Sequence, residues 1–381
     1  MHPILFRVPL PGVELPLVGK LAALPIYSYG VMLGLSLVVG WYLTLGLAEK
    51  DGLDRERMAN NYVVTALVAV LGSRVAYIVT NPSEFHGLAD LVSFRAGGLV
   101  AYGGFLGGFL GSYVYIKTRG LRLLPWADVA VPSLASGLMI TRIGCYLFGC
   151  DYGQPLAAGA PAWLKALGTF PKWPPGTVPD SAGSPAWAEH VARGLVGADA
   201  GASLPVHPTQ LYESLVGLAL LVVLFRVRAH QRFRGQVFFI GTFGYGLLRF
   251  LLELLRDDPE RGSVALSLPR HVLIPLCLVL FGIGYAVGPA RLVSRESMRR
   301  ATIGLALIPG AIAAWKLWPE SFALPEQASL STSQLIGIVT ALAVAVTYAA
   351  HDRAARANPE AAMALGPTGA AAPSDVGPDE G

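Results

Sequence analysis

The most regular feature of the sequence is a series of apolar runs separated by polar segments. A helix of about 20 apolar residues crosses the hydrocarbon core of a bilayer, so each run predicts a membrane-spanning helix. The nine runs lie at roughly 28–48, 61–80, 98–116, 127–148, 208–225, 236–255, 271–288, 302–318 and 334–350. The pattern therefore predicts an all-α polytopic membrane protein.

Composition supports this fold class. Of the 381 residues, 53% are hydrophobic and 14% are charged, whereas soluble domains carry about 25% charged residues. An ordinary soluble enzyme is therefore excluded. The formal net charge of +4 and the lack of a nucleic-acid-binding motif give no reason to expect a nucleic-acid partner. Three cysteines cannot form a disulfide framework, and four-cysteine zinc spacing is absent.

The distribution of Lys and Arg predicts the orientation. Basic clusters occupy every second connection, and positive clusters favour the cytoplasmic side. These clusters contain Lys50, Arg55 and Arg57; Lys117, Arg119 and Arg122; Arg226, Arg228, Arg232 and Arg234; Arg291, Arg295, Arg299 and Arg300; and Arg353 and Arg356. We expect a periplasmic N-terminus and a cytoplasmic C-terminus. Prolines interrupt the first 20 residues, so no cleavable signal peptide is expected.

This topology divides the chain into four parts. Residues 1–27 form a periplasmic segment, 28–290 a membrane-embedded body, 291–350 an extra helical hairpin and 351–381 a disordered cytoplasmic tail. The body contains a long periplasmic loop at 151–206, rich in Pro, Gly, Ala and Trp. Two interpretations of this loop remain open: an ordered surface loop, or an arm that gates a partner or a substrate.

Polar side chains collect near the outer ends of six predicted helices, at one depth of the membrane. They are Tyr29, Arg74, Tyr102, Arg142, His207, Gln210, Tyr212, Glu213, Arg249, Glu253 and Arg256. Charges inside a membrane are costly and usually mark a functional site. This depth is therefore the candidate site.

The charges at this depth permit two interpretations. Arg249, Glu253 and Arg256 follow the spacing i, i+4 and i+7, which suits an ion pair that locks helices together. With Arg74 and Arg142, however, four arginines face few nearby carboxylates. The resulting excess of positive charge predicts an anion, and the planar guanidinium group suits the phosphate of a phospholipid headgroup.

Glycines and cysteines in two of these stretches leave further alternatives. Gly98, Gly103 and Gly104 flank Tyr102, and they serve either helix packing or the approach of lipid to its hydroxyl. Cys145 and Cys150 are too far apart for a disulfide in a continuous helix. A helix that ends near Gly149 would allow the bridge; two free thiols are the other interpretation.

Taken in order, these motifs resemble the prolipoprotein diacylglyceryl transferase family of bacterial inner-membrane enzymes. The resemblance covers roughly residues 25–290. The matching pieces are Tyr29-Gly30; Gly-Ser-Arg74 with Tyr77; Gly-Gly-x₃-Tyr102-Gly-Gly; Asp128 upstream of Arg142-x-Gly; His207-Pro-Thr-Gln210-Leu-Tyr212-Glu213; and Arg249-x₃-Glu253-x₂-Arg256.

The resemblance implies a seven-helix transferase body, here followed by two extra C-terminal transmembrane helices. It implies that phosphatidylglycerol donates its diacylglyceryl group to the lipobox cysteine of a preprolipoprotein signal peptide, within the bilayer and without a metal or cofactor. A thioether forms and glycerol phosphate leaves. The implied catalytic residues are Tyr29, Tyr102, Arg142, Arg249 and Glu253; the implied substrate-binding residues are Arg74, Gly98, Gly103, Gly104, Arg142, His207, Gln210, Tyr212, Glu213 and Arg256.

Three positions depart from the family pattern. The family usually has His at Tyr102, Asn at Cys145 and Glu at Cys150. The group that accepts the thiol proton is therefore open among Tyr29, Tyr102 and His207. Two other functions also remain open: a lipid-binding or transport protein, and an inactive paralogue on the same scaffold.

Overall fold

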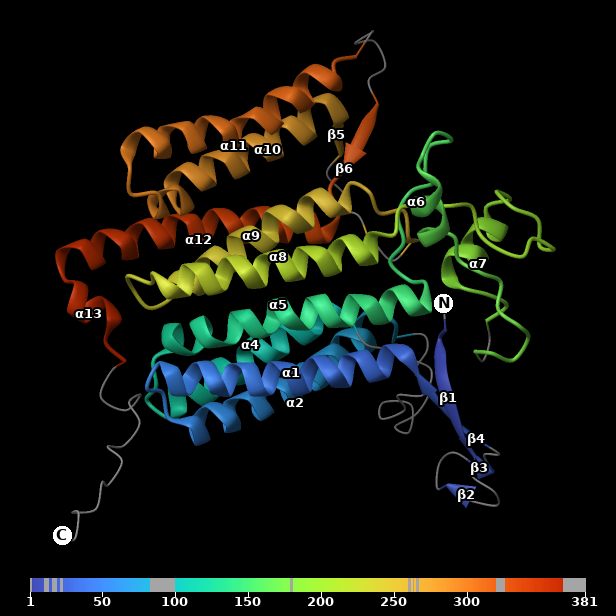
Figure 1. The fold of residues 1–381 in the computed structure, drawn as a ribbon, viewed down its shortest axis with the longest axis horizontal. Coiled ribbons are helices and arrows are strands. Elements are labelled where there is room, and N and C mark those ends of the chain that lie inside the picture. Colours follow the sequence, from blue (N-terminus) through green and yellow to red (C-terminus); the bar gives the residue numbers. More distant parts are fainter. Residues whose placement is uncertain are drawn as a thin grey trace. The chain divides into compact units, whose positions relative to one another are not determined.

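A computed structural model describes residues 2–9, 14–15, 19–20, 23–82, 100–178, 181–259, 262, 264, 267–319 and 326–365. A long helix lies at each of the nine predicted spans (Figure 1). The long helices are α1 (Ser28–Lys50), α2 (Arg55–Thr80), α4 (Ala101–Thr118), α5 (Leu123–Phe148), α8 (Thr209–Ala229), α9 (Gln236–Glu253), α10 (Arg270–Val287), α11 (Glu296–Lys316) and α12 (Thr332–Ala357).

Among the residues that the structure describes, six helical segments are long and apolar enough to cross a membrane. They are Ser28–Lys50, Arg55–Thr80, Leu123–Phe148, Thr209–Ala229, Arg270–Leu292 and Thr332–Ala357. The segment at Arg270–Leu292 joins α10 to a short 3-10 helix, η3 (Pro289–Leu292). The chain is a multi-pass, all-α membrane protein, as the apolar runs predict.

Short strands make up the rest of the regular structure. The N-terminal segment contains two hairpins: β1 (Ile4–Pro9) pairs with β4 (Ala23–Tyr27), and β2 (Glu14–Leu15) pairs with β3 (Gly19–Lys20), all antiparallel. A third antiparallel pair, β5 (Ser267–Pro269) with β6 (Gln327–Ser329), closes the connections before α10 and α12.

The chain forms two compact units. One contains Met1–Gly40 and Leu134–Ala362, and the other contains Trp41–Ser133 and Met363–Gly381. Helices α1 and α5 contribute residues to both. We call the first unit the site unit, because it contains Arg142, Glu213 and Arg249, and the second the α2–α4 unit.

Glycines bring α2 and α4 into contact in the α2–α4 unit. A side chain at Gly103 would collide with the carbonyl of Gly72, and one at Gly107 with the carbonyl of Val68. Small residues allow two helix backbones to approach closely, as is common in membranes. Near the basic ends of these helices, buried apolar side chains form a separate core that includes Leu45, Met58, Ile116 and Trp126.

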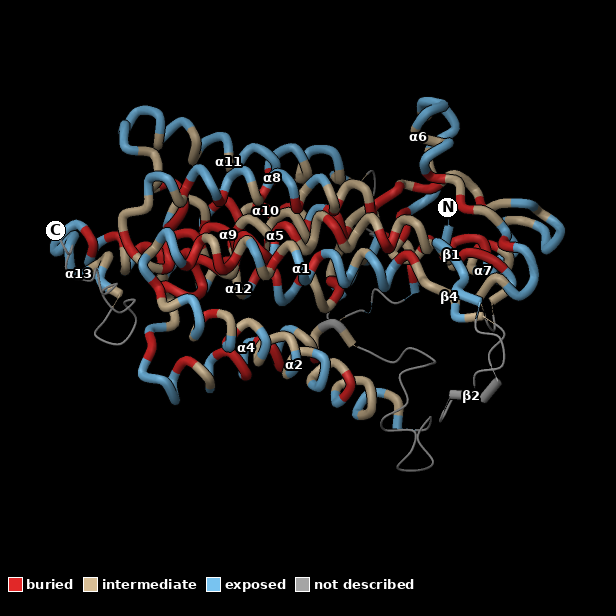
Figure 2. Tube along the Cα trace, turned by 60° about the horizontal axis from the view of Figure 1, so that its bottom comes forward, coloured by how far each residue is buried: buried red, intermediate tan, exposed pale blue. Residues whose placement is uncertain are grey.

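The site unit is organised around α9. Its side chains Phe243 and Phe250 share one apolar core with Phe281 of α10 and Ile338 of α12. Figure 2 shows this inner position of α9 and α12 and the exposure of α11, in which Gly310 alone is buried. The two helices added after the body therefore differ, because α12 completes the core around α9 and α11 packs on α10.

The long periplasmic loop predicted at 151–206 is ordered within its described residues. It contains α6 (Ala162–Leu167) and α7 (Pro185–Ala192), and it buries its own core of Tyr152, Phe170, Ala186 and Val206. Two of its tryptophans, Trp173 and Trp187, are buried, and Trp163 on α6 is exposed. The structure thus supports an ordered loop and leaves the gating interpretation as a hypothesis.

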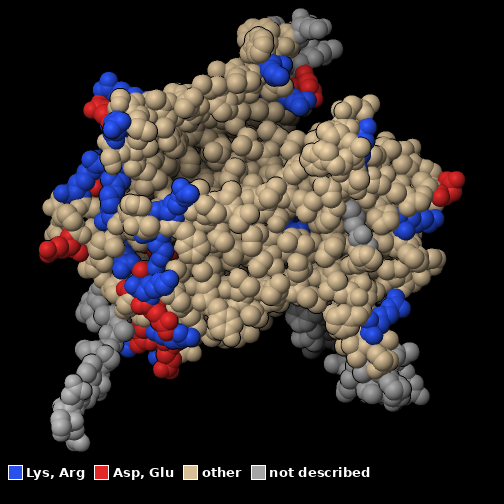
Figure 3. Space-filling model, in the orientation of Figure 1, with Lys and Arg blue, Asp and Glu red and all other residues tan. Residues whose placement is uncertain are grey.

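A buried aspartate organises the end of the site unit that carries the basic clusters. Asp352 is 1% exposed and pairs with Arg232 at 3.2 Å, Arg356 at 3.1 Å and Arg291 at 3.7 Å. On the visible face in Figure 3, Lys and Arg gather near helix ends, and the middle of the long helices is almost uncharged.

These contacts correct one boundary. The expected disordered tail at 351–381 begins too early, because α12 continues to Ala357 and α13 (Pro359–Met363) follows. The ion pairs of Asp352 hold this segment against the rest of the site unit. Residues from 366 lie outside the described part of the chain.

Candidate active site

The end of α5 positions the first part of the site. The amide of Gly149 donates to the carbonyl of Cys145 at 2.7 Å, and Gly149 has a φ of 91°. A glycine in this left-handed conformation is a common helix terminator, because it lacks a Cβ. Asp151 follows, also with a positive φ of 55°. These two residues place the Asp151 carboxylate beside Arg142, which lies nine residues earlier on α5.

Arg142 connects this turn to α8. Its Nη1 lies 2.7 Å from Oδ2 of Asp151, and its Nε lies 2.8 Å from Oε2 of Glu213. Glu213 is on the second turn of α8 and is 3% exposed. The guanidinium plane of Arg142 is therefore fixed from two directions.

The end of α9 adds two more arginines. Nη1 of Arg249 lies 2.6 Å from Oε1 of Glu213, and Nη2 lies 3.1 Å from Oε2 of Glu253. Nη2 of Arg256 lies 2.5 Å from Oδ1 of Asp151. Glu213 therefore joins Arg142 to Arg249, and Asp151 joins Arg142 to Arg256. The result is one continuous network across α5, α8 and the end of α9.

The network corrects the expected charge balance. Arg256 also pairs with Asp258 at 2.6 Å, so three guanidinium groups meet four carboxyl groups. The predicted excess of positive charge is wrong for this cluster. Arg74, the fourth arginine, lies in the α2–α4 unit, where it is 7% exposed and packs over the ring of Tyr77. An anion that binds here must compete with carboxylates that are already in place.

Burial and charge act against each other on Asp151. Desolvation alone would raise the pKa of its carboxyl group, but Arg142 and Arg256 hold the pKa below its ordinary value. Asp151 stays ionised at neutral pH as a result. Its position also bears on one departure from the family pattern. Cys150 stands where Glu is usual, and the adjacent Asp151 restores a carboxylate to this turn.

The motif from His207 to Glu213 supports the same turn. Thr209 donates through its hydroxyl to the carbonyl of Asp151 at 2.5 Å, and Nε2 of Gln210 donates to the carbonyl of Cys150 at 2.5 Å. Gln210 is fully buried. His207 and Tyr212 contact each other, with 3.3 Å between Nδ1 and the hydroxyl oxygen. Thr209, Gln210 and Glu213 therefore position the network.

Helix α1 reaches the site through a glycine. A Cβ added at Gly144 would lie 3.0 Å from Cβ of Met32 and 3.2 Å from Cα of Tyr29. The glycine of Arg142-x-Gly thus lets the first turns of α1 pack against α5, two residues beyond Arg142. Tyr29 is 40% exposed there.

Four of the predicted site residues lie outside this unit. Tyr102, Gly103 and Gly104 belong to the α2–α4 unit, as does Arg74. A side chain at Gly104 would collide with Oγ of Ser73 on α2, so both described glycines face a neighbouring helix. Gly98 lies outside the described residues.

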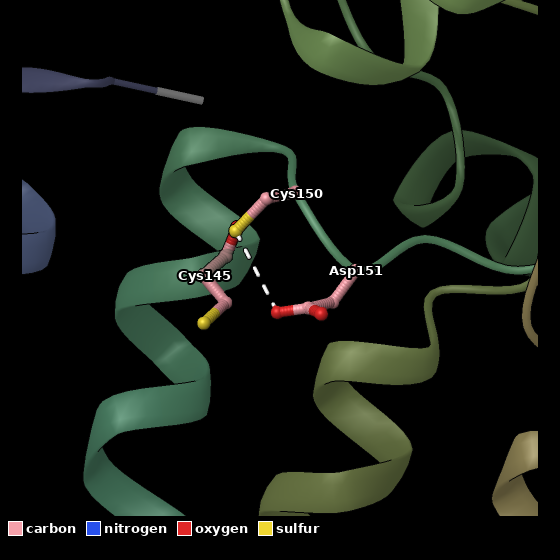
Figure 4. Close-up of side chains that lie close together, drawn as sticks. All are labelled: Cys145, Cys150 and Asp151. Carbon is pink, nitrogen blue, oxygen red and sulfur yellow. Dashed lines mark hydrogen bonds between the residues drawn. The ribbon is translucent and has the colours of Figure 1, made fainter. Parts of the chain in front are cut away.

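The cysteines are free thiols at the edge of the network (Figure 4). Nη1 of Arg142 lies 3.8 Å from Sγ of Cys145, and Sγ of Cys150 lies 3.7 Å from Oδ2 of Asp151. Ligand atoms of these two cysteines and Asp151 fall within 4.8 Å of one another, a spacing that suits a metal ion. Asp151 already pairs with two arginines, however, and their positive charge opposes a bound cation.

Four contributors were not among the sequence-predicted site residues. Asp151 and Asp258 are network carboxylates, and Thr209 donates to the carbonyl of Asp151. Ser333 of α12 accepts a hydrogen bond from Nη2 of Arg249 at 3.4 Å. Asp151 directly follows Cys150, in the stretch that contains Arg142 and both cysteines, so the sequence could have indicated its carboxylate as a partner of Arg142. Nothing in the sequence around Ser333 indicates that contact, which depends on how α12 packs against α9.

Comparisons with known proteins identify the family of the chain. A family model described as prolipoprotein diacylglyceryl transferase matches residues 16–287. The chain is 28% identical to phosphatidylglycerol–prolipoprotein diacylglyceryl transferase of Clostridium tetani over 268 residues, which cover 70% of this chain and 95% of the relative. It is 28% identical to transferase 2 of that name from Clostridium perfringens over 267 residues, 70% of this chain and 91% of the relative.

A third relative comes from another genus. The transferase of the same name from Bacillus cereus is 27% identical over 246 residues, which cover 63% of this chain and 80% of the relative. The family match includes Arg142, Glu213 and Arg249 and ends before α11 and α12. The chain therefore belongs to the prolipoprotein diacylglyceryl transferase family.

Proposed function

We propose that this protein transfers the diacylglyceryl group of phosphatidylglycerol to the cysteine thiol of prolipoproteins. Its family and the names of its relatives support this activity. The structural observation that carries the proposal is the buried arginine–carboxylate network at the ends of apolar helices. Rigid cationic donors at the ends of apolar helices suit the phosphate of a phospholipid headgroup.

The reaction makes one bond and breaks one. The thiol sulfur attacks the glyceryl carbon that bears the phosphate, and a carbon–sulfur bond forms. The carbon–oxygen bond to phosphate breaks, its electron pair leaves with glycerol phosphate, and the thiol proton passes to a base. Catalysis therefore requires neutralisation of the leaving phosphate and a base near the thiol.

Arg142 is the best candidate for the phosphate contact. It uses Nε and Nη1 in its ion pairs with Glu213 and Asp151, so the N–H groups of Nη2 can face a phosphate oxygen. Its side chain is 17% exposed, more than Arg249 at 11% or Arg256 at 6%. Glu213 and Asp151 hold the guanidinium group in advance, which lowers the cost of orienting it in the transition state.

His207 is the best candidate for the base. Burial lowers the pKa of its ring below the ordinary value of about 6.5, so the ring is neutral at neutral pH and can accept a proton. The contact between its Nδ1 and Tyr212 fixes the ring and leaves Nε2 for the thiol. Tyr29 at the start of α1 and Tyr102 of α4 are the competing candidates.

We further propose that the network faces the periplasm. Within the site unit, Glu213 and Arg249 lie at one end of α8 and α9, and the basic cluster around Asp352 lies at the other. Basic ends favour the cytoplasm. A signal peptide carries its cleavage region just after an apolar segment, so its cysteine would reach the depth of the network.

Complementation tests this function. A bacterium depleted of its own diacylglyceryl transferase should grow when it expresses this chain, and should not grow when it expresses the Arg142→Ala variant at equal membrane abundance. Cys277→Ser is the matched control, because Cys277 lies in α10 among apolar core residues. Failure of the native chain, with normal insertion, would favour an inactive paralogue or a lipid-binding protein.

A further inference from the structure

The way α5 ends brings two thiols together. The carbonyl of Cys145 accepts the hydrogen bond from the amide of Gly149, and Cys150 directly follows that glycine. In this type of helix end, the residues on either side of the glycine turn commonly touch. Cys145 and Cys150 are five residues apart and would not touch in a continuous helix, but the glycine turn brings them into contact. Sγ of Cys150 lies 3.8 Å from the carbonyl oxygen of Cys145.

Figure 4 shows how the two side chains lie. The Cys150 side chain points back toward the last turns of α5, which carry Cys145, and a dashed line joins its sulfur to the Asp151 carboxylate. Cys145 is buried and Cys150 is half-buried, and both are free thiols. Cys150 is therefore the more accessible residue of the two, and the sulfur atoms lie within 4.8 Å of each other.

Two nearby thiols can bind a metal ion or become oxidised to a disulfide, and the charges around them favour one of the two. A divalent metal ion would bring two positive charges next to Arg142, whose Nη1 lies 3.8 Å from Sγ of Cys145. The metal would also have to displace Arg142 and Arg256 from the carboxylate of Asp151, with which they pair at 2.7 Å and 2.5 Å. A disulfide adds no charge and displaces no ion pair directly. The surroundings therefore favour oxidation over metal binding.

We propose that Cys145 and Cys150 are a reversible dithiol–disulfide pair, a modification site beside the arginine network. The oxidant is a disulfide, carried by a small molecule or by a thiol oxidase. The Cys150 thiolate attacks one sulfur of that disulfide, which gives a mixed disulfide and releases one thiol. Cys145 then attacks Sγ of Cys150, which closes the internal bridge and releases the second thiol. Two protein thiols are oxidised, and one oxidant disulfide is reduced to two thiols.

The bridge would act on the network through the backbone. Asp151 follows Cys150 directly and is held in a left-handed conformation, at a φ of 55°. Drawing Sγ of Cys150 toward Cys145 moves it away from Oδ2 of Asp151, now at 3.7 Å, and shifts the carboxylate that joins Arg142 to Arg256. An effect on activity rests on the proposed transferase function; the formation of the bridge does not.

A thiol count tests the bridge by itself. The purified full-length protein in detergent is reduced, exposed to oxidised dithiothreitol, denatured and treated with a maleimide. We expect two of the three thiols to become unreactive, and the peptide that spans residues 145–150 to lose the mass of two hydrogen atoms. Reduction should restore both thiols. The Cys277→Ser variant should behave in the same way, with no thiol remaining after oxidation.

Three results would overturn the proposal. One is that Cys145 and Cys150 both remain reactive at oxidant levels that oxidise other vicinal dithiol proteins. Another is that the thiols are protected by zinc added to the reduced protein and not by the oxidant, which would assign the pair to a metal. Covalent dimers in Cys277→Ser would likewise show that the cysteines pair between chains.

Activity provides a second readout. Oxidation should lower the transfer rate of the native protein and of Cys277→Ser by roughly 10–100-fold. This is the loss expected when one hydrogen bond between charged groups is broken. The same treatment should leave the rate of the Cys145→Ser, Cys150→Ser double variant unchanged relative to its own untreated rate. If the bridge forms and the native rate does not change, the link to Asp151 is wrong. If the untreated protein has no activity and the bridge forms, the proposed function fails and the redox pair stands.

Discussion

At the scale of single residues, the site depends on shared carboxylates. Glu213 divides its two oxygens between Arg142 and Arg249, and Asp151 divides its own between Arg142 and Arg256. Each of these arginines is therefore held by at least two carboxylates, and none is free to follow the substrate. Rigid donors stabilise a transition state better than mobile ones, because they need no reorganisation during the reaction.

Replacement of Arg142 tests this arrangement. Arg142→Ala should lower the transfer rate by roughly 10²–10³-fold, as the loss of a preorganised donor does at other sites. Arg142→Lys should recover little, because an ammonium group cannot bind Asp151, Glu213 and a phosphate together. Rates measured in phosphatidylglycerol vesicles, with gel filtration to check folding, decide the matter. Near-native rates in Arg142→Ala would leave the network with a structural role alone.

The proton acceptor can be identified from the pH dependence. The pKa of His207 lies below its ordinary value because of burial, and the neutral ring is the form that accepts a proton. The rate should therefore be constant at neutral pH and fall only as the pH drops below about 6.5. His207→Gln should abolish this acid limb and most of the activity.

Tyr29→Phe and Tyr102→Phe are the matched variants for that test. Each removes a hydroxyl and keeps the ring and its packing. If His207 is the base, both variants should retain the acid limb and a substantial rate. Loss of activity in Tyr102→Phe, with His207→Gln active, would return the role to the position where the family usually has histidine.

At the scale of elements, the helices were predictable and some of their partners were not. Apolar runs located all nine long helices to within a few residues at most ends, because a bilayer requires a minimum apolar length. The shared depth of Arg142, Glu213 and Arg249 also predicted their meeting. The pairing of Asp151 with two arginines could not be predicted, because the direction of its side chain depends on left-handed backbone at both Gly149 and Asp151. The contribution of α12 depends on tertiary packing alone.

Helix α12 allows a paired test of packing and function. Ser333 contacts Arg249, and Ser331 caps the same helix by accepting from the amide of Gln334 at 3.2 Å. Ser333→Ala should lower the transfer rate roughly 2–10-fold with little change in stability. Ser331→Ala should lower the free energy of unfolding by about 1 kcal/mol. Equal effects of both variants on rate and on melting temperature would mean that α12 acts only as a scaffold.

At the scale of the whole molecule, charge distinguishes the two ends of the helices. In the site unit one end carries buried ion pairs with more carboxylates than arginines, and the other carries Arg232, Arg291 and Arg356 around the carboxylate of Asp352. Figure 3 shows the uncharged middle that separates helix ends on the visible face. This asymmetry is the physical basis of the predicted orientation, and it follows from the sequence because the positive-inside rule counts residues in loops.

Labelling of single cysteines tests the orientation. In a background without native cysteines, Ala157→Cys in the long loop and Ala229→Cys at the end of α8 are both exposed positions. A membrane-impermeant maleimide added to intact cells with a permeabilised outer membrane should label Ala157→Cys only. Both should be labelled after the inner membrane is opened. Labelling of Ala229→Cys in the intact cells would reverse the assigned orientation.

The most direct test of the account is the reaction itself. The purified protein, in vesicles that contain phosphatidylglycerol, is incubated with a synthetic signal peptide that carries a lipobox cysteine, and the peptide is analysed by mass spectrometry. We predict a peptide that has gained one diacylglyceryl group on sulfur, with release of glycerol phosphate and no product from Arg142→Ala. An unmodified peptide, under conditions in which a relative's transferase modifies it, would contradict the proposed function.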